Sequence, residues 1–143
     1  MPQVEFHFNA PDKLNYVCRL LRKAVSQGAK MGVLTSPQSL PALDDALWKL
    51  LPTDFLPHCL ASDESPLLAH SSVILASETS VLAGMPNLKI LLNLQEAVPS
   101  DLAHFERVIE VVGQDEQDKA MARLRWKHYA SCDMALLRHD LKT

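Results

Sequence analysis

The first 36 residues contain a strand, a helix and a second strand, and this order constrains the fold more than any other feature. Residues 4–8 (VEFHF) alternate and are rich in β-forming side chains, which predicts a strand. An apolar stripe from Leu14 to Val25, followed by Gly28, predicts a helix with a left-handed end. The run 29–36 (AKMGVLTS) predicts a second strand, buried on both faces. Such a unit implies parallel pairing and a right-handed crossover.

The rest of the chain repeats this alternation. The predicted elements are a helix over 39–51, a short strand at the end of the Pro-bracketed segment 52–61, strands over 71–77, 87–95 and 107–113, and a helix over 114–130. Residues 132–143 are mixed in character, and we expect them to cap the fold or to add a short helix. The pattern predicts an α/β fold, a three-layer sandwich with a mostly parallel, Rossmann-like sheet. At 143 residues, the chain fits a single domain over 1–143.

Motifs and net charge argue against several functional classes. A net charge of −3 disfavours a surface that mainly neutralises duplex phosphates. Neither G-x-x-x-x-G-K-[ST] nor G-x-G-x-x-G occurs, and NAPDK follows the first strand where a nucleotide-binding loop would lie. The chain has no G-x-S-x-G elbow, and its histidines are dispersed. We therefore expect no catalytic activity, no cofactor and no metal.

The cysteines and the apolar runs indicate where in the cell the protein is located. The three cysteines, Cys18, Cys59 and Cys132, are far apart and form no C-x-x-C pair, which favours a reduced compartment. The N-terminal residues contain acids and lack the apolar region of a secretion signal. Polar residues or prolines interrupt the apolar runs before they could span a membrane. We expect a cytoplasmic protein that does not enter membranes.

The segment 122–131 (ARLRWKHYAS) gathers cations around Trp126, one of two tryptophans. At about 100° per residue, a helical wheel places Arg123 and Lys127 beside Trp126. The predicted core side of this helix consists of Met121, Leu124 and His128. Trp126 is expected roughly opposite that side.

Two interpretations of this basic aromatic face remain open. Acids early in the helix and bases late in it satisfy the helix dipole, and the C-terminal tail could cover Trp126. Alternatively, Arg123 and Lys127 bind the oxygens of an acidic peptide while Trp126 forms an apolar wall for its side chain. Stacking of single-stranded bases is a further use of the same chemistry.

The second tryptophan also borders a predicted core. Trp48 lies at the margin of the leucine stripe of 39–51, and Phe55 follows in the Pro-bracketed segment. The two aromatic residues either seal one end of the sheet or form a hydrophobic docking surface for a partner chain.

Three segments together resemble the chi subunit of bacterial DNA polymerase III. These are the FHF strand at 6–8, LDDALWKLLPTDFLPHCLA at 43–61, and FERVIEVVGQDEQDKAMARLRWKHYA at 105–130. The resemblance implies an α/β, non-catalytic accessory of the clamp loader that reaches DNA only indirectly. It also implies two partners: the psi subunit and the acidic C-terminal tail of single-stranded-DNA-binding protein.

The resemblance assigns residues to both partners. It implies a tail site of Arg123, Trp126 and Lys127, with Val112 lining the pocket. It implies a psi-facing surface with Trp48 and Phe55. Some relatives use that aromatic patch to engage a repair helicase, so this partner is also open.

The chain departs from the family pattern in three places. Trp126 stands where tyrosine is the family alternative, nothing is transferred to residues 62–72, and Asp133 stands near an expected glycine. Two other functional classes stay open: a direct single-stranded nucleic-acid-binding module and a nucleotide-dependent enzyme.

Overall fold

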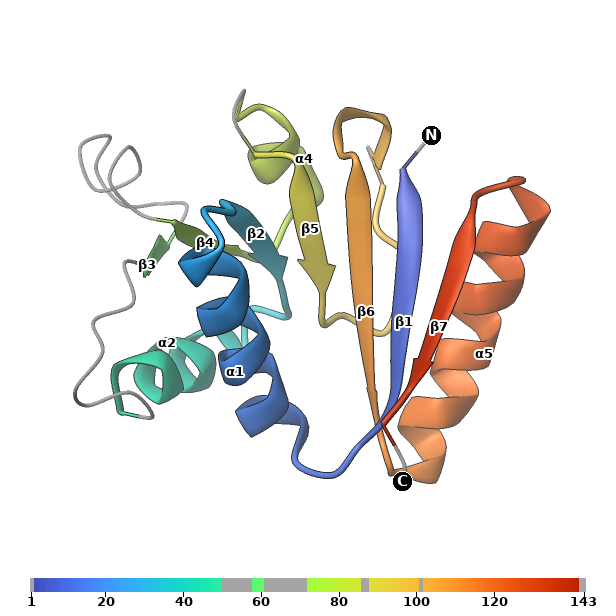
Figure 1. Cartoon of the computed structure of the whole chain (residues 1–143), viewed down its shortest axis with the longest axis horizontal. Coiled ribbons are helices and arrows are strands. Elements are labelled where there is room, and N and C mark those ends of the chain that lie inside the picture. Colours follow the sequence, from blue (N-terminus) through green and yellow to red (C-terminus); the bar gives the residue numbers. More distant parts are fainter. Residues whose placement is uncertain (1, 50–57, 61–71, 86–87, 101, 142–143) are drawn as a thin grey trace.

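The sheet of this protein is parallel at every pairing in the described part of the chain (Figure 1). A computed structural model describes all residues except 1, 50–57, 61–71, 86–87, 101 and 142–143. The strands are β1 (Gln3–Ala10), β2 (Met31–Leu34), β3 (His58–Leu60), β4 (Val73–Ala76), β5 (Ile90–Asn93), β6 (Arg107–Gly113) and β7 (Leu136–Asp140). Within that description they form one seven-stranded sheet in the order β3-β4-β2-β5-β6-β1-β7.

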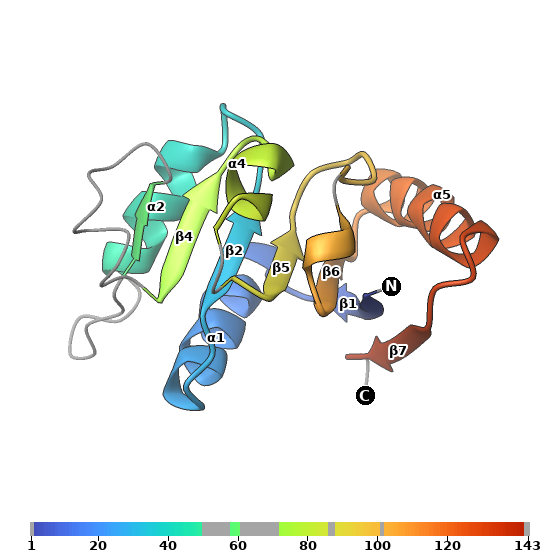
Figure 2. The same ribbon diagram turned by 90° about the horizontal axis from the view of Figure 1, so that it is seen from above.

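Helices cover both faces of the sheet. They are α1 (Lys13–Ser26), α2 (Leu40–Lys49), α4 (Thr79–Ala83) and α5 (Glu116–Ser131), with a 3-10 helix η1 (Leu102–His104). Buried side chains of α1 and α2 share one apolar core, and those of α4, η1 and α5 share a second core. Figure 2 shows α1 and α5 on opposite sides of the sheet. The predicted three-layer α/β architecture is confirmed.

A side-chain cap, an apolar helix face and a glycine in the left-handed conformation shape the first βαβ unit. The Asp12 carboxylate caps α1 by accepting a hydrogen bond from the Asn15 N–H at 3.1 Å. Val17 and Leu21 point from α1 into the core. Gly28 has a φ of 85°, the left-handed conformation that lets the chain leave the helix at low energetic cost.

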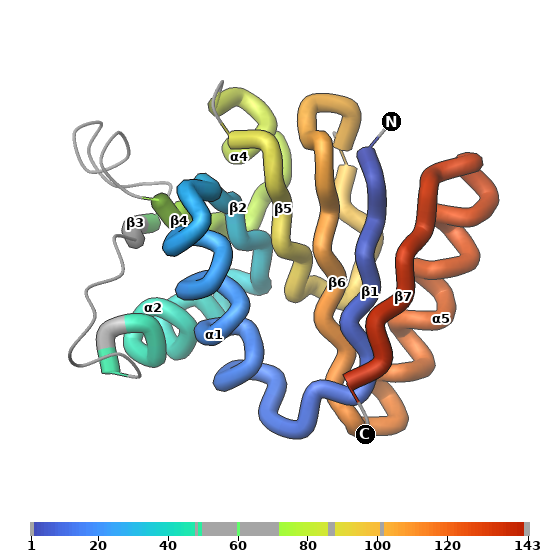
Figure 3. The backbone as a smooth tube through the Cα atoms, in the orientation of Figure 1, coloured from blue at the N-terminus to red at the C-terminus, as the bar shows by residue number. Residues whose placement is uncertain are grey.

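The C-terminal residues depart from the expectation of a cap or a short helix. Residues 136–140 form β7, which pairs in parallel with β1, and Leu136 lies opposite Val4. Helix α5 carries the chain from β6 across β1 to this edge (Figure 3). Four of the five β7 residues are exposed, so the segment lacks the apolar run that announces a buried strand. Asp133, in the turn before β7, has a φ of 58°, which explains why glycine would suit this position.

Other expectations fall partly outside the described residues. The short strand expected within 52–61 is β3, whereas residues 50–57 and most of 62–72 lie outside the description. No helix within the described ranges has the length and apolar character needed to cross a membrane.

Candidate functional site

The side of helix α5 that packs on the sheet differs from the side predicted from its apolar residues. Its buried residues are Ala122, Arg125 and Tyr129. Leu124, predicted to face the core, is 59% exposed, and His128, also predicted there, is exposed. The predicted core side of α5 is therefore wrong.

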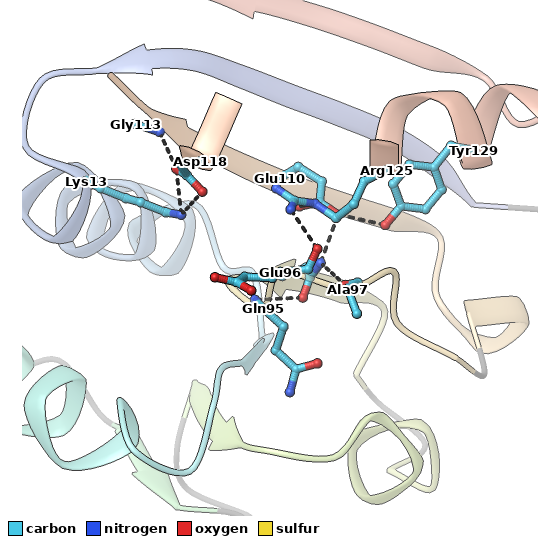
Figure 4. Close-up of polar contacts among 10 residues, drawn as sticks. Lys13, Gln95, Glu96, Ala97, Glu110, Gly113, Asp118, Arg125 and Tyr129 are labelled. Atoms are coloured by element: carbon cyan, nitrogen blue, oxygen red, sulfur yellow. Dashed lines mark hydrogen bonds and ion pairs between the residues drawn. The ribbon is translucent and has the colours of Figure 1, made fainter. Parts of the chain in front are cut away.

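A buried carboxylate on β6 explains this orientation. Glu110 is fully buried and accepts hydrogen bonds from Arg125 Nε at 3.0 Å, Tyr129 Oη at 2.7 Å and Asn93 Nδ2 at 2.9 Å. Figure 4 shows Arg125 and Tyr129 reaching Glu110 from α5. Burial raises the pKa of Glu110, while the Arg125 guanidinium and the three donors oppose the rise. Because the helix is anchored by polar groups, hydrophobic periodicity could not reveal which side is buried.

A second polar contact fixes the start of α5. Asp118 accepts hydrogen bonds from the Gly113 N–H at 2.8 Å and from Lys13 Nζ at 3.1 Å (Figure 4). Burial alone would raise the pKa of Asp118, but the Gly113 hydrogen bond and the Lys13 charge outweigh it and lower the pKa. The helix is thus tied to the end of β6 and to α1.

Trp126 lies at the boundary between the core and solvent. Its indole is half-buried and packs edge-on against Phe6 of β1, with ring centroids 5.0 Å apart. Phe8 of the same strand lies 6.2 Å from it. The expectation that Trp126 points away from the core is therefore wrong, because the helix is rotated toward Glu110 and one part of the indole rests on β1.

The remaining part of the indole lines a surface depression, which we call the basic hollow. It has a volume of about 380 Å³ and is lined by Phe8, Asn9, Lys119, Arg123, Trp126, Lys127 and Arg138. Three of the four residues implied for the tail site therefore lie together. Val112 does not line the hollow, because its side chain is fully buried in the core beneath α5.

The cations of the basic hollow differ in their surroundings. Arg123 and Lys127 are exposed and form no ion pair with an acid in the described part of the chain. Lys119 Nζ lies 3.8 Å from Glu116 Oε1, a weak surface contact. The guanidinium of Arg138 lies over the Phe8 ring, with Cζ 4.7 Å from the ring centroid. Cations around two aromatic rings suit a ligand that combines carboxylates with an apolar group.

Sequence reasoning did not assign four of the lining residues to the hollow: Phe8, Asn9, Lys119 and Arg138. Phe8 alternates with Phe6 along β1, so period-2 alternation does place both on one face. No local sequence pattern indicated that Arg138 lies in the hollow, because its position depends on β7 joining the sheet beside β1.

The second predicted surface falls on side chains outside the described part of the chain. Trp48 belongs to α2, but its side chain lies outside the description, as does the whole of Phe55. Among the described residues, no group of three or more histidine, cysteine, aspartate or glutamate side chains is placed to hold a metal ion.

Comparison with known proteins identifies a family. Residues 1–136 match the family described as DNA polymerase III chi subunit, HolC. The DNA polymerase III subunit chi of Pseudomonas aeruginosa is 28% identical over 133 residues, which cover 90% of this chain and 87% of that protein. The corresponding protein of Haemophilus influenzae is 33% identical over 88 residues, covering 59% of this chain and 56% of that protein. The chain therefore belongs to the DNA polymerase III chi subunit family, whose members are accessory subunits in DNA replication.

Proposed function

We propose that this chain links the polymerase III clamp loader, through the psi subunit, to the acidic C-terminal tail of single-stranded-DNA-binding protein. The basic hollow is the tail site, with Arg123 and Lys127 binding carboxylate oxygens and Trp126 contacting the terminal apolar side chain. The chain contributes no catalysis and contacts DNA only through its partners.

The observation that carries the proposal is the placement of exposed cations beside a half-buried indole in one depression. The whole chain has a net charge of −3, yet the described residues that line the basic hollow include four cations and no acid. An anionic ligand is therefore attracted to the basic hollow despite the negative net charge of the chain. The partly covered indole offers an apolar wall that is already fixed by Phe6, so little ordering is needed on binding.

Tethering is the mechanism that such a site supports. A charge-assisted contact on an exposed surface has modest affinity and weakens as salt increases. Once one partner is bound, however, the local concentration of the other rises, and two modest contacts give a stable link.

The tail site is tested by titrating a fluorescent acidic peptide with a free apolar C-terminus against wild type and Arg123→Gln. Arg123 is exposed, so its substitution should weaken the peptide about tenfold while the thermal unfolding midpoint stays unchanged. Arg19→Gln, an equal change of charge on the opposite face, is the matched control. If Arg123→Gln bound the peptide with unchanged affinity, the hollow would not be the tail site.

A labelled single-stranded oligonucleotide, titrated in parallel, distinguishes the alternative function. The proposal expects the peptide to bind and the oligonucleotide to bind far more weakly. Tighter binding of the oligonucleotide, lost in Arg123→Gln, would instead identify a direct nucleic-acid-binding module.

The psi surface needs its own experiment. Trp48→Ala and Phe55→Ala should weaken capture of purified psi without changing the affinity for the acidic peptide. Retained psi capture in both variants would refute the placement of this surface, and joint loss with unfolding would show that the aromatic residues belong to the core.

A further inference from the structure

The basic hollow draws its cations from two separate elements. Lys119, Arg123 and Lys127 follow one another at intervals of four residues along α5, so they form a row of roughly 12 Å on one face of the helix. Arg138 enters the hollow from β7, at the edge of the sheet. A ligand in the hollow can therefore meet positive charge from two elements.

Arg138 is held in place by Phe8. Its guanidinium Cζ lies 4.7 Å from the centroid of the Phe8 ring, and that ring in turn lies 6.2 Å from Trp126. A planar guanidinium stacked on an aromatic face keeps its N–H edges available for carboxylate oxygens. The stack also restricts the rotamers of a long side chain, which lowers the entropy lost when a ligand binds.

Edge protection is the competing explanation for Arg138. β7 is the last strand of the sheet, and charged residues on an edge strand discourage pairing with other chains. That role requires charge but no particular contact, whereas Arg138 is stacked on a residue of the hollow. The neighbouring Asp140 carboxylate accepts a hydrogen bond from Asn9 Nδ2 at 2.8 Å.

We infer that Arg138 is a specificity-determining residue of the basic hollow, which binds a second acidic group of the peptide upstream of its terminal carboxylate. This inference rests on the proposed function of the hollow as a tail site. An extended peptide advances about 3.3 Å per residue, so about four residues match the α5 row. The hollow therefore prefers chain ends with clustered acidic side chains over ends that carry the terminal carboxylate alone.

Two labelled six-residue peptides test the inference. Both end in the same apolar residue with a free carboxylate; one has two aspartates upstream, and the other has two asparagines. Fluorescence anisotropy gives the Kd of each for wild type, Arg138→Gln, Arg138→Lys and the control Arg19→Gln. Arg138→Gln should weaken the aspartate peptide about three- to fivefold and leave the asparagine peptide unchanged. Arg19→Gln should not alter the ratio of the two affinities.

Arg138→Lys separates recognition from edge protection. It keeps the charge but loses the planar stack and the forked donors, so it should lose part of the preference for the aspartate peptide. This variant also carries the test if Arg138→Gln does not fold, as judged by circular dichroism.

The results that would contradict the role of Arg138 differ from those that would contradict the proposed tail site. Equal weakening of both peptides by Arg138→Gln, or no weakening of either, would overturn the role of Arg138 and leave the tail site standing. Wild-type protein that binds neither peptide would overturn the proposed function, and the inference with it.

Discussion

A single buried carboxylate decides which way the binding helix faces. Glu110 accepts three hydrogen bonds, of which two come from α5, through Arg125 and Tyr129. Arg125 Nη1 also donates to the Glu96 carbonyl at 2.9 Å, so the guanidinium is satisfied on both sides. With these two α5 residues turned inward, the adjacent Trp126 comes to rest on β1.

Removing the Glu110 charge should therefore destabilise the protein strongly. Glu110→Gln leaves the Arg125 guanidinium buried without its counter-charge, and the free energy of unfolding should fall by about 3–5 kcal/mol, measured by urea denaturation. Glu116→Gln, which alters an exposed contact with Lys119 and an acid in the first turn of α5, should change it by less than about 1 kcal/mol. Similar stability of the two variants would contradict an anchoring role for Glu110.

Asp118 makes a prediction about pH. Its pKa is lowered in the folded protein, so its contribution is fully present above the ordinary value of 3.8 and is lost as pH falls through the lowered value. Asp118→Asn should be less stable than wild type by about 1 kcal/mol near neutral pH. The two stability curves should converge as pH falls below 3.8, in urea unfolding measured over a pH series. A difference that persists there would assign the effect to packing.

At the scale of elements, the β1–β7 pairing completes the binding site. It brings Arg138 to the hollow on one face and places His139 opposite His7 on the other face. The two imidazole centroids are 4.9 Å apart, and His7 Nδ1 shares a hydrogen bond with the Tyr16 hydroxyl of α1. Edge strand β7 thus contributes side chains to both faces of the sheet.

The histidine contact predicts that stability declines in mild acid. Burial lowers the pKa of His7, and His139 and Arg107 lower it further, whereas Glu5 opposes them. Because the pKa of His7 is lowered in the folded protein, the folded state favours the neutral imidazole. The contribution of His7 to the free energy of unfolding is therefore complete above the ordinary pKa of 6.5, and it declines as pH falls below that value. His7→Gln should flatten the dependence of the unfolding free energy on pH below about 6.5. An unchanged slope would exclude His7 as its source.

At the scale of the whole molecule, two apolar cores share one sheet. Leu21 belongs to the core beneath α1, and Trp126 packs at the margin of the core beneath α5. The strands that separate these cores are buried on both faces, as in β4. Loss of packing in one core should therefore lower the stability of the other core as well.

This arrangement predicts one cooperative unfolding transition. In a Trp48→Phe background, Leu21→Ala should destabilise the protein by about 2–5 kcal/mol. The circular dichroism transition and the Trp126 fluorescence transition should shift together. Separate midpoints for the two signals would show that the two sides of the sheet unfold independently.

The alternation of elements and much of the basic hollow follow from local sequence patterns. Strands buried on both faces need continuous apolar runs, and these are visible without coordinates. The hollow's cations on α5 follow from four-residue spacing, so the grouping of Arg123 and Lys127 around Trp126 was predictable.

The rotation of α5 and the role of the C-terminal residues depend instead on contacts between segments that are distant in the sequence. The buried side of α5 is anchored by Arg125 and Tyr129 to Glu110, and a polar anchor carries no hydrophobic signal. Strand β7 is exposed along most of its length, so it is held mainly by backbone pairing with β1. Backbone hydrogen bonds of this kind do not require particular side chains, and the sequence therefore gives no sign of them. Arg138 therefore joins the hollow through a contact between segments about 130 residues apart, which local sequence patterns do not encode.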